Sequence, residues 1–479
     1  MLLTKKLLKE INGSLSLNAG GSGEAAIELG PPSIDTRKIN KGDTFFGIDG
    51  EARDGCEFFE QAIEKGAGCV VLTSNYREMF EKSEIARKHK AAGLFVASTR
   101  VALRQLGFSN RLTHSVPFVA VTGSNGKTTT KELIAAILGR KYRVFKTAGN
   151  FNNDLGLPMQ LMCLDKSHEI GVVELGMSAP GEIDSLASLV LPRVGVITCV
   201  GPSHIEFLKT LKNIARAKAE LIPRVDTQGC LILNYDNNYT RKMSSQYSGR
   251  SVGYSISNRS SKIQAKNVTV NENGFYDFDC VVKTDLKNYP PFRVSLNLAG
   301  RHNVLNALAA ICAAIEFGVS TADIVNGLND FNGVQKRMEL IKLSGGVTVL
   351  NDCYNANPLS MKSALETVSE FKAFSGRRVA ILGDMLELGN WSVRAHSDMG
   401  RLAAKCGVEL LVTVGEKSKY TMQAAIEAGF APERALHFSD SAEAAGRVRQ
   451  IVKTGDFVLI KGSRGMKLEV VLNALQGEK

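Results

Sequence analysis

From residue 116 onward, continuous apolar runs alternate with stretches in which apolar residues recur at helical spacing. Because the strands of a covered parallel sheet are buried on both faces, such alternation predicts βα units and a mostly parallel sheet. Residues 262–298 interrupt the pattern with shorter alternating runs that predict an antiparallel edge or flap, and residues 300–319 predict a long helix. The strands are predicted at 117–122, 142–147, 169–175, 194–200 and 230–234.

After about residue 335 the alternation restarts in four apolar runs, each of which ends in a loop containing Gly or Asp. This arrangement is typical of a second doubly wound sheet. The four runs are "VTVLND", "RRVAILGD", "ELLVTVGE" and "DFVLIKGS".

The first 115 residues have a mixed pattern. Short alternating runs between residues 33 and 50 predict a small sheet, and residues 58–72 predict a helix, a glycine turn and a buried strand. With 479 residues the chain is too long for a single ordinary core. We therefore expect an α/β protein with a small mixed N-terminal domain (1–115), a central domain with a mostly parallel sheet (116–334) and a Rossmann-like C-terminal domain (335–479).

Composition narrows the class of protein. Apolar residues make up 44% and charged residues 22% of the chain, which is typical of soluble globular proteins. No apolar run is long enough to cross a bilayer, and the N-terminus lacks the apolar block of a signal peptide, so we expect a cytoplasmic protein without membrane insertion. The nine cysteines form no C-x-x-C pair and are expected to be reduced, buried thiols.

The net charge of +11 leaves open a nucleotide-dependent protein that binds nucleic acid. However, the sequence contains no dense basic run with interleaved aromatic residues, which such a surface would need. A site for polyanionic small molecules needs only a few of the positive charges. We therefore expect no nucleic-acid partner.

A glycine turn separates the first predicted strand of the central domain from a helix, in the stretch "FVAVTGSNGKTTTKELIAAIL" (118–138). Backbone N–H groups of such a turn and the helix N-terminus favour an anion. Lys127 would place a positive charge against the outer phosphates, and Thr128 would offer a hydroxyl to Mg²⁺. The G-x-x-G-K-T spacing is two residues shorter than the general Walker pattern, so the loop alone indicates only a nucleotide phosphate.

Two further side chains are candidates for a metal site because they follow apolar strands. Glu174 ends the run "IGVVE", and His204 follows the run "VGVITCV". In an open α/β sheet, ligands bind beyond the carboxyl ends of the strands. Mg²⁺ prefers oxygen ligands, so His204 would belong to a second metal position beside the one formed by Thr128 and Glu174.

Nine motifs occur in an order that resembles the Mur ligases, and the resemblance covers essentially the whole chain. Within the family they are most similar to the member that adds D-alanyl-D-alanine to a UDP-N-acetylmuramoyl-tripeptide. Absence of a C-terminal D-N-P-R motif favours this member over the ligase that adds the third residue, and the long N-terminal segment argues against a folylpolyglutamate synthase-like enzyme. The motifs are "TGSNGKTTTKE", "TAGNFNNDLGLP", "VVELGM", "SHIEFL", "IARAKAEL", "GRHNVLNALAA", "DCYNANPLSM", "LGDMLELG" and "KGSRGMKLE".

The resemblance implies a reaction. ATP would phosphorylate the terminal carboxylate of the tripeptide, and the amine of the dipeptide would attack the resulting acyl phosphate to give an amide, ADP and phosphate. Positioning of the substrates and neutralisation of charge would be the main tasks of the protein. The resemblance further implies a P-loop-type ATPase domain, Mg²⁺ at two positions, a role in cytoplasmic peptidoglycan precursor synthesis, and a monomer.

The resemblance also implies roles for single residues. Lys127, Lys218, His204 and Arg337 would be catalytic, and Lys218 would carry a carbamate that joins Thr128, Glu174 and His204 at the metal sites. Asn303 and Asn306 would meet the adenine, Arg337 the γ-phosphate and Asp352 the ribose, with Tyr354 nearby. The nucleotide site would thus comprise Gly123, Asn125, Gly126, Lys127, Thr128, Thr129, Asn303, Asn306, Arg337, Asp352 and Tyr354.

The remaining assignments concern the other two substrates. One set would lie in the uridine-diphosphate site, although Asp and Gly are common in ordinary turns as well. A second pair would contact the muramoyl-peptide, and a third would lie at the dipeptide end. In that order, the sets are Asp35, Thr36, Arg37, Asp54 and Gly55; Asn150 and Asn153; and Ser463 and Arg464.

Overall fold

A computed structural model describes residues 1–17, 27–48, 50, 53–283, 289–371 and 376–477. Residue 49, residues 51–52 of the N-terminal motif and residues 284–288 of the predicted antiparallel segment lie outside the described residues. The chain divides into two compact units, which are considered separately. The first comprises Met1–Phe118, Arg143–Leu175 and Asp184–Leu191, and the second Val119–Tyr142, Gly176–Ile183 and Pro192–Lys479.

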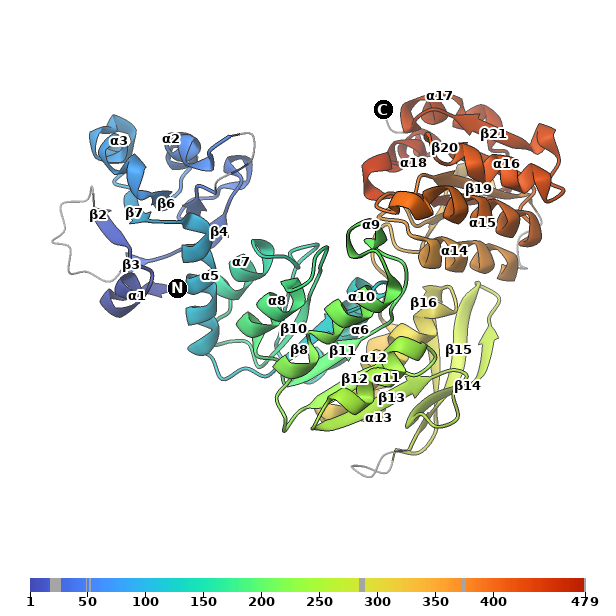
Figure 1. Ribbon diagram of the computed structural model, residues 1–479, viewed down its shortest axis with the longest axis horizontal. Coiled ribbons are helices and arrows are strands. Elements are labelled where there is room, and N and C mark those ends of the chain that lie inside the picture. The colour runs from blue at the N-terminus through green and yellow to red at the C-terminus, as the bar shows by residue number, and fades with distance from the viewer. Residues whose placement is uncertain (18–26, 49, 51–52, 284–288, 372–375, 478–479) are drawn as a thin grey trace. The chain divides into compact units, whose positions relative to one another are not determined.

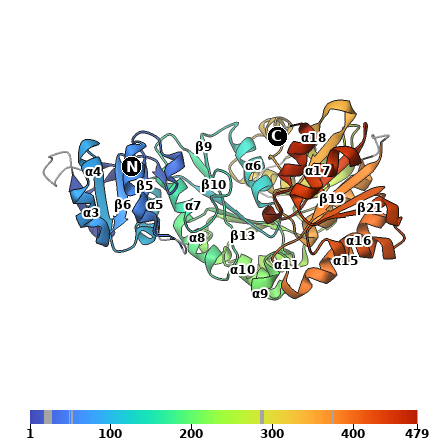
Figure 2. The ribbon, with the colours of Figure 1, turned by 90° about the horizontal axis from the view of Figure 1, so that it is seen from above.

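The first unit is built on a five-stranded sheet in the order β2-β7-β6-β5-β4, parallel except for β2. Figure 2 shows α3 and α5 on opposite sides of β5 and β6. Alternation along the strands explains this: one apolar set packs against α1 and α5, the other against α2, α3 and α4. The strands are β2 (Ser14–Leu17), β4 (Pro32–Ser33), β5 (Thr44–Phe46), β6 (Cys69–Thr73) and β7 (Ala92–Val96), and the helices α1 (Lys5–Glu10), α2 (Phe59–Glu64), α3 (Arg77–Lys82), α4 (Glu84–Lys88) and α5 (Thr99–Leu112).

The first unit also contains a parallel strand pair, β9 (Val144–Lys146) and β10 (Ile170–Glu174), and the helix α7 (Gly156–Met162). Helix α5 packs closely on α7, since a Cβ at Gly107 would lie 2.6 Å from the carbonyl oxygen of Pro158. An antiparallel pair, β1 (Leu2–Leu3) and β3 (Ile27–Glu28), and most of α8 (Glu182–Val190) complete the unit.

The second unit begins with strands in the order β16-β15-β14-β13-β12-β11-β8, parallel from β8 to β14 and antiparallel from β14 to β16. The antiparallel edge predicted at 262–298 is therefore confirmed for its described residues. The strands are β8 (Phe118–Thr122), β11 (Val194–Ile197), β12 (Cys230–Asn234), β13 (Arg250–Ser255), β14 (Ile263–Val270), β15 (Phe275–Val282) and β16 (Phe292–Ala299).

Helices cover these strands because each helix has a broad apolar face. Helix α12 (His302–Glu316), predicted as the long helix at 300–319, packs against α6 (Lys127–Leu138) and β12, and α13 (Thr321–Asn329) packs against α6. Eleven residues of α12 are buried, which explains its alanine-rich sequence. The shorter helices are α9 (Ile205–Leu208), α10 (Leu211–Ala219) and α11 (Asn238–Met243).

The rest of the second unit is a six-stranded sheet in the order β17-β18-β22-β19-β20-β21, parallel except for β17. Helices α17 and α18 pack on one face, and α14 and α15 lie on the other (Figure 1). The predicted doubly wound sheet is thus confirmed. Its elements are β17 (Glu339–Lys342), β18 (Thr348–Asn351), α14 (Pro358–Glu370), β19 (Arg378–Gly383), α15 (Ser392–Lys405), β20 (Leu410–Val414), α16 (Lys419–Glu427), β21 (Ala435–Phe438), α17 (Ser441–Ile451), β22 (Phe457–Lys461) and α18 (Glu469–Gln476).

All nine cysteines are free thiols, as expected, but not all are buried. Cys163 is exposed and Cys199 is half-buried, while the other seven are buried. Among the described residues, no helix combines the length and the apolar character needed to cross a bilayer.

Candidate active site

The glycine turn predicted to hold phosphate connects β8 to α6. Gly126 has a φ of +79° and forms the N-cap of α6, and Gly123 has a φ of +149°. Residues other than glycine rarely adopt such backbone angles. The turn therefore needs glycine at both positions, and it places the N-terminus of a 12-residue helix where an anion is favoured.

The segment after β11 holds this loop from one side. Thr198 Oγ1 donates to the carbonyl oxygen of Asn125 at 2.5 Å, and Ser124 Oγ donates to that of Gly201 at 2.9 Å. The backbone N–H of Ser124 also donates to the carbonyl oxygen of Cys199 at 2.9 Å. These bonds fix the loop before any ligand binds, which is the preorganisation that phosphate binding needs.

Two lysines approach the loop. Lys127 Nζ donates to the carbonyl oxygen of Gly123 at 2.9 Å, so its ammonium lies over the turn. Lys218, on α10, is only 2% exposed. Burial, with a further contribution from the positive charge of Lys127, lowers the pKa of Lys218 to about 7. A neutral amine at this position is therefore accessible near physiological pH.

His204 lies beyond β11 and is the N-cap of α9. Its backbone is left-handed, with a φ of +52°, and its Nδ1 lies 2.6 Å from Glu387 Oε2. Glu387, which is in the loop after β19, also has a left-handed backbone with a φ of +61°. The close contact with His204 lowers the pKa of the Glu387 carboxyl. Strained backbone on both partners is typical of functional positions.

Glu174 ends β10 in the first unit and is only 2% exposed. Asn152 Nδ2 donates to its Oε1 at 2.8 Å, and the backbone N–H of Glu174 donates to Thr147 Oγ1 at 3.1 Å. The sequence drew attention to Asn150 and Asn153 but not to Asn152. Among the three neighbouring Asn residues, the sequence carries no signal that singles out the one bonded to Glu174.

The candidate metal ligands do not form a conventional cluster. Among the described residues, no group of three or more His, Cys, Asp or Glu side chains is placed to hold a metal ion. Of the four predicted ligands, only Glu174 and His204 belong to those types. Thr128 would contribute a hydroxyl, and Lys218 would contribute a carbamate. The donors are thus mainly oxygens, which fits Mg²⁺.

The carboxyl ends of β18 and β22 carry a second group of candidates. The guanidinium of Arg337 lies 4.0 Å from the centroid of the Tyr354 ring, and that of Arg464 lies 6.0 Å from the same centroid. Lys336 and Met338, on either side of Arg337, both have left-handed backbone. The strained turn and the stacked ring together fix the direction of the Arg337 side chain.

Asp352 is tied to the same turn. Its Oδ1 accepts a hydrogen bond from the backbone N–H of Met338 at 3.1 Å, and its Oδ2 lies 2.5 Å from Lys461 Nζ. Lys461 is 1% exposed and also donates to the carbonyl oxygen of Asn355 at 3.0 Å. Lys461 carries no signal in the sequence, because a lysine at the end of an apolar strand usually extends to solvent.

The two residues assigned to the dipeptide end differ in their surroundings. Ser463 is 3% exposed, and its Oγ accepts from the N–H of Leu386 at 2.9 Å and donates to the carbonyl oxygen of Ala356 at 3.3 Å. Arg464 is exposed and its guanidinium lies 3.0 Å from Glu469. Ser463 therefore ties together three loops at the carboxyl ends of the strands, while Arg464 pairs with Glu469 at the start of α18.

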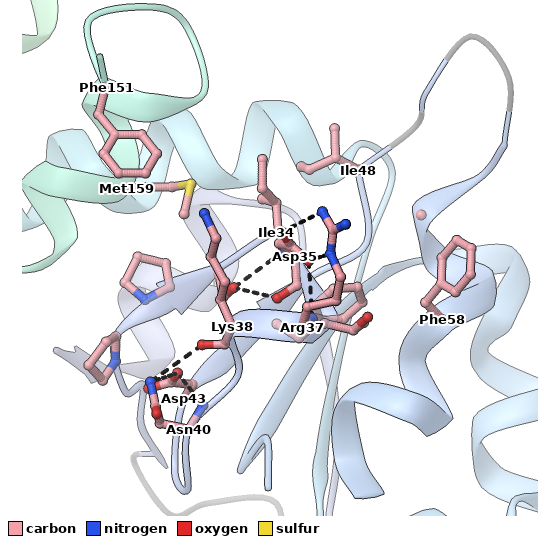
Figure 3. A pocket seen from close by; sticks show the side chains of 16 residues that line it. Ile34, Asp35, Arg37, Lys38, Asn40, Asp43, Ile48, Phe58, Phe151 and Met159 are labelled. Carbon is pink, nitrogen blue, oxygen red and sulfur yellow. Dashed lines mark hydrogen bonds and ion pairs between the residues drawn. The ribbon is translucent and has the colours of Figure 1, made fainter. Parts of the chain in front are cut away.

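A pocket in the first unit gathers most of the residues expected at the uridine-diphosphate site (Figure 3). Arg37 forms two hydrogen bonds with Asp35, of 2.8 and 2.9 Å, which lower the pKa of the Asp35 carboxyl to about 2. Phe58 and Phe151 add apolar walls. The pocket is lined by Pro31, Pro32, Ser33, Ile34, Asp35, Thr36, Arg37, Lys38, Asn40, Asp43, Phe45, Ile48, Gly55, Phe58, Phe151 and Met159.

Three other predicted substrate residues do not line this pocket. Asp54 Oδ1 accepts from the N–H of Cys56 and caps the short helix Gly55–Phe58, and Asn153 Oδ1 accepts from the N–H of Gly156 at the start of α7. Asn150 is exposed. Local hydrogen bonds to the backbone explain the residue types at 54 and 153, so any contact of these three with substrate stays a prediction.

Comparison with known proteins identifies the family. A model described as "Mur ligase middle domain" matches residues 121–314, and one described as "Mur ligase, glutamate ligase domain" matches residues 336–464. A UDP-N-acetylmuramoyl-tripeptide–D-alanyl-D-alanine ligase of Bacillus subtilis is 34% identical over 450 residues, which cover 92% of each chain. The chain belongs to the Mur ligase family.

Solved Mur ligase structures agree with this membership. MurF from Acinetobacter baumannii superimposes with a TM-score of 0.84 at 30% identity, covering 100% of this chain and 99% of that one. The MurF ligase from Thermotoga maritima, solved in complex with ADP, gives a TM-score of 0.78 at 25% identity, covering 94% and 98% of the two chains. The predicted family and fold class, with three α/β domains of the Mur ligase type, are therefore confirmed.

Proposed function

We propose that the chain is an ATP-dependent ligase that joins D-alanyl-D-alanine to a UDP-N-acetylmuramoyl-tripeptide in peptidoglycan precursor synthesis. Similarity to ligases of this named activity over more than nine-tenths of both chains carries the proposal. It favours this reaction over the third-residue ligase, the folylpolyglutamate synthase-like enzyme and the nucleic-acid-binding protein that the sequence had left open.

The geometry of the phosphate loop supports the ATP half of the reaction. A carboxylate is a poor electrophile, and transfer of the γ-phosphoryl group of ATP would give it a leaving group. Lys127 would neutralise charge on the phosphates beside the N-terminus of α6, and Arg337, held against Tyr354, would approach them from the C-terminal domain. Asp352 would bind the ribose hydroxyls. We retain the proposed boundaries of 1–115 for UDP-substrate binding, 116–334 for ATP binding and 335–479 for the nucleotide and dipeptide side.

We further propose Mg²⁺ at two positions held by Thr128, Glu174, His204 and a carbamate on Lys218. Bound Mg²⁺ neutralises the charge that develops on phosphoryl oxygens. The lowered pKa of Lys218 supports the carbamate, since only a neutral amine reacts with CO₂. A carbamate would also replace the repulsion between Lys218 and Lys127 by an attraction.

The first-unit pocket would bind the uridine diphosphate, with Arg37 and Lys38 available to its phosphates. Asn150 and Asn153 would contact the muramoyl-peptide, and Arg464 would bind the carboxylate of the dipeptide, with Ser463 supporting the loop. We also propose that the protein acts as a cytoplasmic monomer.

A phosphate-release assay tests the reaction. Phosphate should be released from ATP only when UDP-N-acetylmuramoyl-tripeptide and D-alanyl-D-alanine are both present, and the product should carry a pentapeptide by mass spectrometry. Oxygen-18 in the terminal carboxylate of the tripeptide should move into the released phosphate. Release that accompanies the addition of a single amino acid would contradict the proposal.

A further inference from the structure

Glu469, the first residue of α18, holds two cationic side chains with one carboxylate oxygen. Its Oε1 accepts a hydrogen bond from Arg464 Nη1 at 3.0 Å and another from Lys336 Nζ at 3.3 Å. Arg464 precedes Glu469 by five residues, whereas Lys336 lies 133 residues away, in the left-handed turn before β17. One carboxylate therefore joins the loop after β22 to the turn that carries Arg337.

The backbone between Arg464 and Glu469 is shaped for this contact. A single 3-10 turn, Arg464–Met466, ends at Lys467, whose backbone is left-handed with a φ of +51°. The N–H of Met466 donates to the carbonyl oxygen of Ser463 at 2.9 Å, and that of Lys467 donates to the carbonyl oxygen of Arg464 at 3.2 Å. The tight turn brings the start of α18 back to Arg464, and a carboxylate is favoured in the first turn of a helix.

The guanidinium of Arg464 has few restraints besides this one. The side chain is 59% exposed, and the centroid of the Tyr354 ring lies 6.0 Å from the guanidinium, at the limit of a cation–π contact. A long side chain in such surroundings samples many rotamers unless a partner holds it. Glu469 engages Nη1, and since a guanidinium has five N–H donors, others remain for an anionic ligand.

A carboxylate beside Arg464 has two opposite effects on an anionic ligand. It repels the ligand, so its removal would strengthen binding if charge balance were its main role. It also orders the guanidinium in advance, so its removal would weaken binding by the cost of ordering one side chain. Since Arg464 is open to solvent, water and salt screen the repulsion, and we expect the ordering effect to be the larger one.

We propose that Glu469 is a positioning residue that orients Arg464 toward the carboxylate of the incoming dipeptide. The inference rests on the proposed function, in which Arg464 binds this carboxylate and Arg337 the γ-phosphate. Through Lys336, Glu469 also fixes the spacing between the two arginines. A dipeptide held at its carboxylate by an ordered guanidinium presents its amine, at the other end, in a defined position for attack on the acyl phosphate.

Steady-state kinetics of the full-length protein with D-alanyl-D-alanine and with its C-terminal amide test the inference. The amide lacks the charge that Arg464 would bind, so the ratio of the two kcat/KM values reports recognition of the carboxylate and does not depend on the amount of folded enzyme. Arg464→Ala should lower this ratio about 10- to 100-fold. Glu469→Ala should lower it about three- to tenfold, and the double variant should lose little more than Arg464→Ala alone.

Asp398→Asn is the matched control, because it breaks an exposed pair with Arg401 on α15 and should leave the ratio unchanged. A wild-type ratio in Glu469→Ala would overturn the inference, and a higher ratio would do so in favour of charge balance. Losses that add up in the double variant would show that Glu469 does not act through Arg464. A wild-type protein that adds no dipeptide would instead contradict the proposed function.

Discussion

Lys461 Nζ lies 2.5 Å from Asp352 Oδ2, and Lys461 is almost completely buried. The pair joins the ends of β18 and β22, and the other oxygen of Asp352 holds the backbone of Met338. Through this connection, the proposed ribose ligand and the turn that carries Arg337 are parts of one rigid arrangement.

Lys461→Met should therefore impair both folding and nucleotide use. Removing one partner of a buried ion pair leaves the other charge uncompensated, so we expect a loss of about 3–5 kcal/mol in the free energy of unfolding. Denaturant unfolding of the variant measures it. Lys362→Met, which breaks an exposed pair with Glu366 on α14, is the control and should cost about 0–1 kcal/mol. Equal losses in the free energy of unfolding for the two variants would refute a structural role for Lys461.

In the folded fraction of Lys461→Met, the KM for ATP should rise more than the KM for either peptide substrate.

Lys127→Ala should lower kcat by about 100- to 1,000-fold, because a positive charge is lost where negative charge accumulates in the transition state. The pocket around Arg37 belongs to the other compact unit, so binding of the UDP-substrate should be unchanged by calorimetry. Normal turnover in this variant would exclude Lys127 from phosphoryl transfer. A parallel loss of UDP-substrate binding would point to misfolding.

Lys218→Met should stabilise the folded protein while abolishing activity. In the folded state burial lowers the pKa of Lys218 to about 7, whereas the ordinary value is 10.5. Between these values the unfolded chain binds more protons than the folded chain, so the stability of the wild type rises with pH across this window. The gain in melting temperature from Lys218→Met should consequently be largest at or below pH 7 and should vanish near pH 10.5.

The comparison requires CO₂-depleted buffer so that the amine is unmodified. A gain in melting temperature that is the same at every pH would show that burial does not lower the pKa of Lys218. Separately, Lys218→Ala should be inactive and should recover part of its activity in formate or acetate, which can replace the missing carbamate. Full activity of that variant without any added carboxylate would contradict the carbamate.

Arg37→Ala should weaken UDP-substrate binding by about tenfold, since one charge-assisted contact to phosphate is lost. The same change removes the hydrogen bonds that hold the pKa of Asp35 near 2, so NMR titration should show that pKa returning toward its ordinary value of 3.8. Arg100→Ala, an exposed arginine on α5 that pairs with Asp154 outside the pocket, should change neither quantity. Wild-type affinity in Arg37→Ala would place the uridine diphosphate elsewhere.

The sequence was sufficient for the fold because strand burial and helix packing leave periodic patterns. The strands predicted at 117–122 and 230–234 agree with β8 and β12 to within one residue at each end. The phosphate loop could also be predicted, since turns with left-handed backbone favour glycine and the pattern of a helix follows directly. The contacts of Lys461 and Asn152 could not be predicted from the sequence. Their importance comes from partners that are distant in sequence or indistinguishable from neighbouring amides, and no local pattern records such pairings.

The same limit applies to Asn303 and Asn306. The resemblance implied that they would meet the adenine, and the sequence itself assigned them no contact. Neither source indicated a contact with Gly126, because that contact depends on how closely α12 approaches the loop after β8. Only the folded structure shows that a Cβ at Gly126 would lie 2.4 Å from Asn306 Oδ1.

The pair formed by His204 and Glu387 predicts a spectroscopic signal. If His204 binds a metal ion through Nδ1, Glu387 has to give up its contact with that nitrogen, and the loop after β19 has to move with it. Trp391, four residues further on, is the only tryptophan in the sequence and is 43% exposed. Its backbone N–H donates to the carbonyl oxygen of Leu388 at 3.0 Å, so Trp391 moves with the same loop. Addition of ATP with Mg²⁺ should therefore change the emission of Trp391, and ATP with EDTA should change it less. In Glu387→Gln, which weakens the contact with His204, the starting emission should already be shifted toward the ligand-bound value. An emission spectrum that stays constant while calorimetry shows saturation with Mg²⁺ and ATP would rule out this exchange.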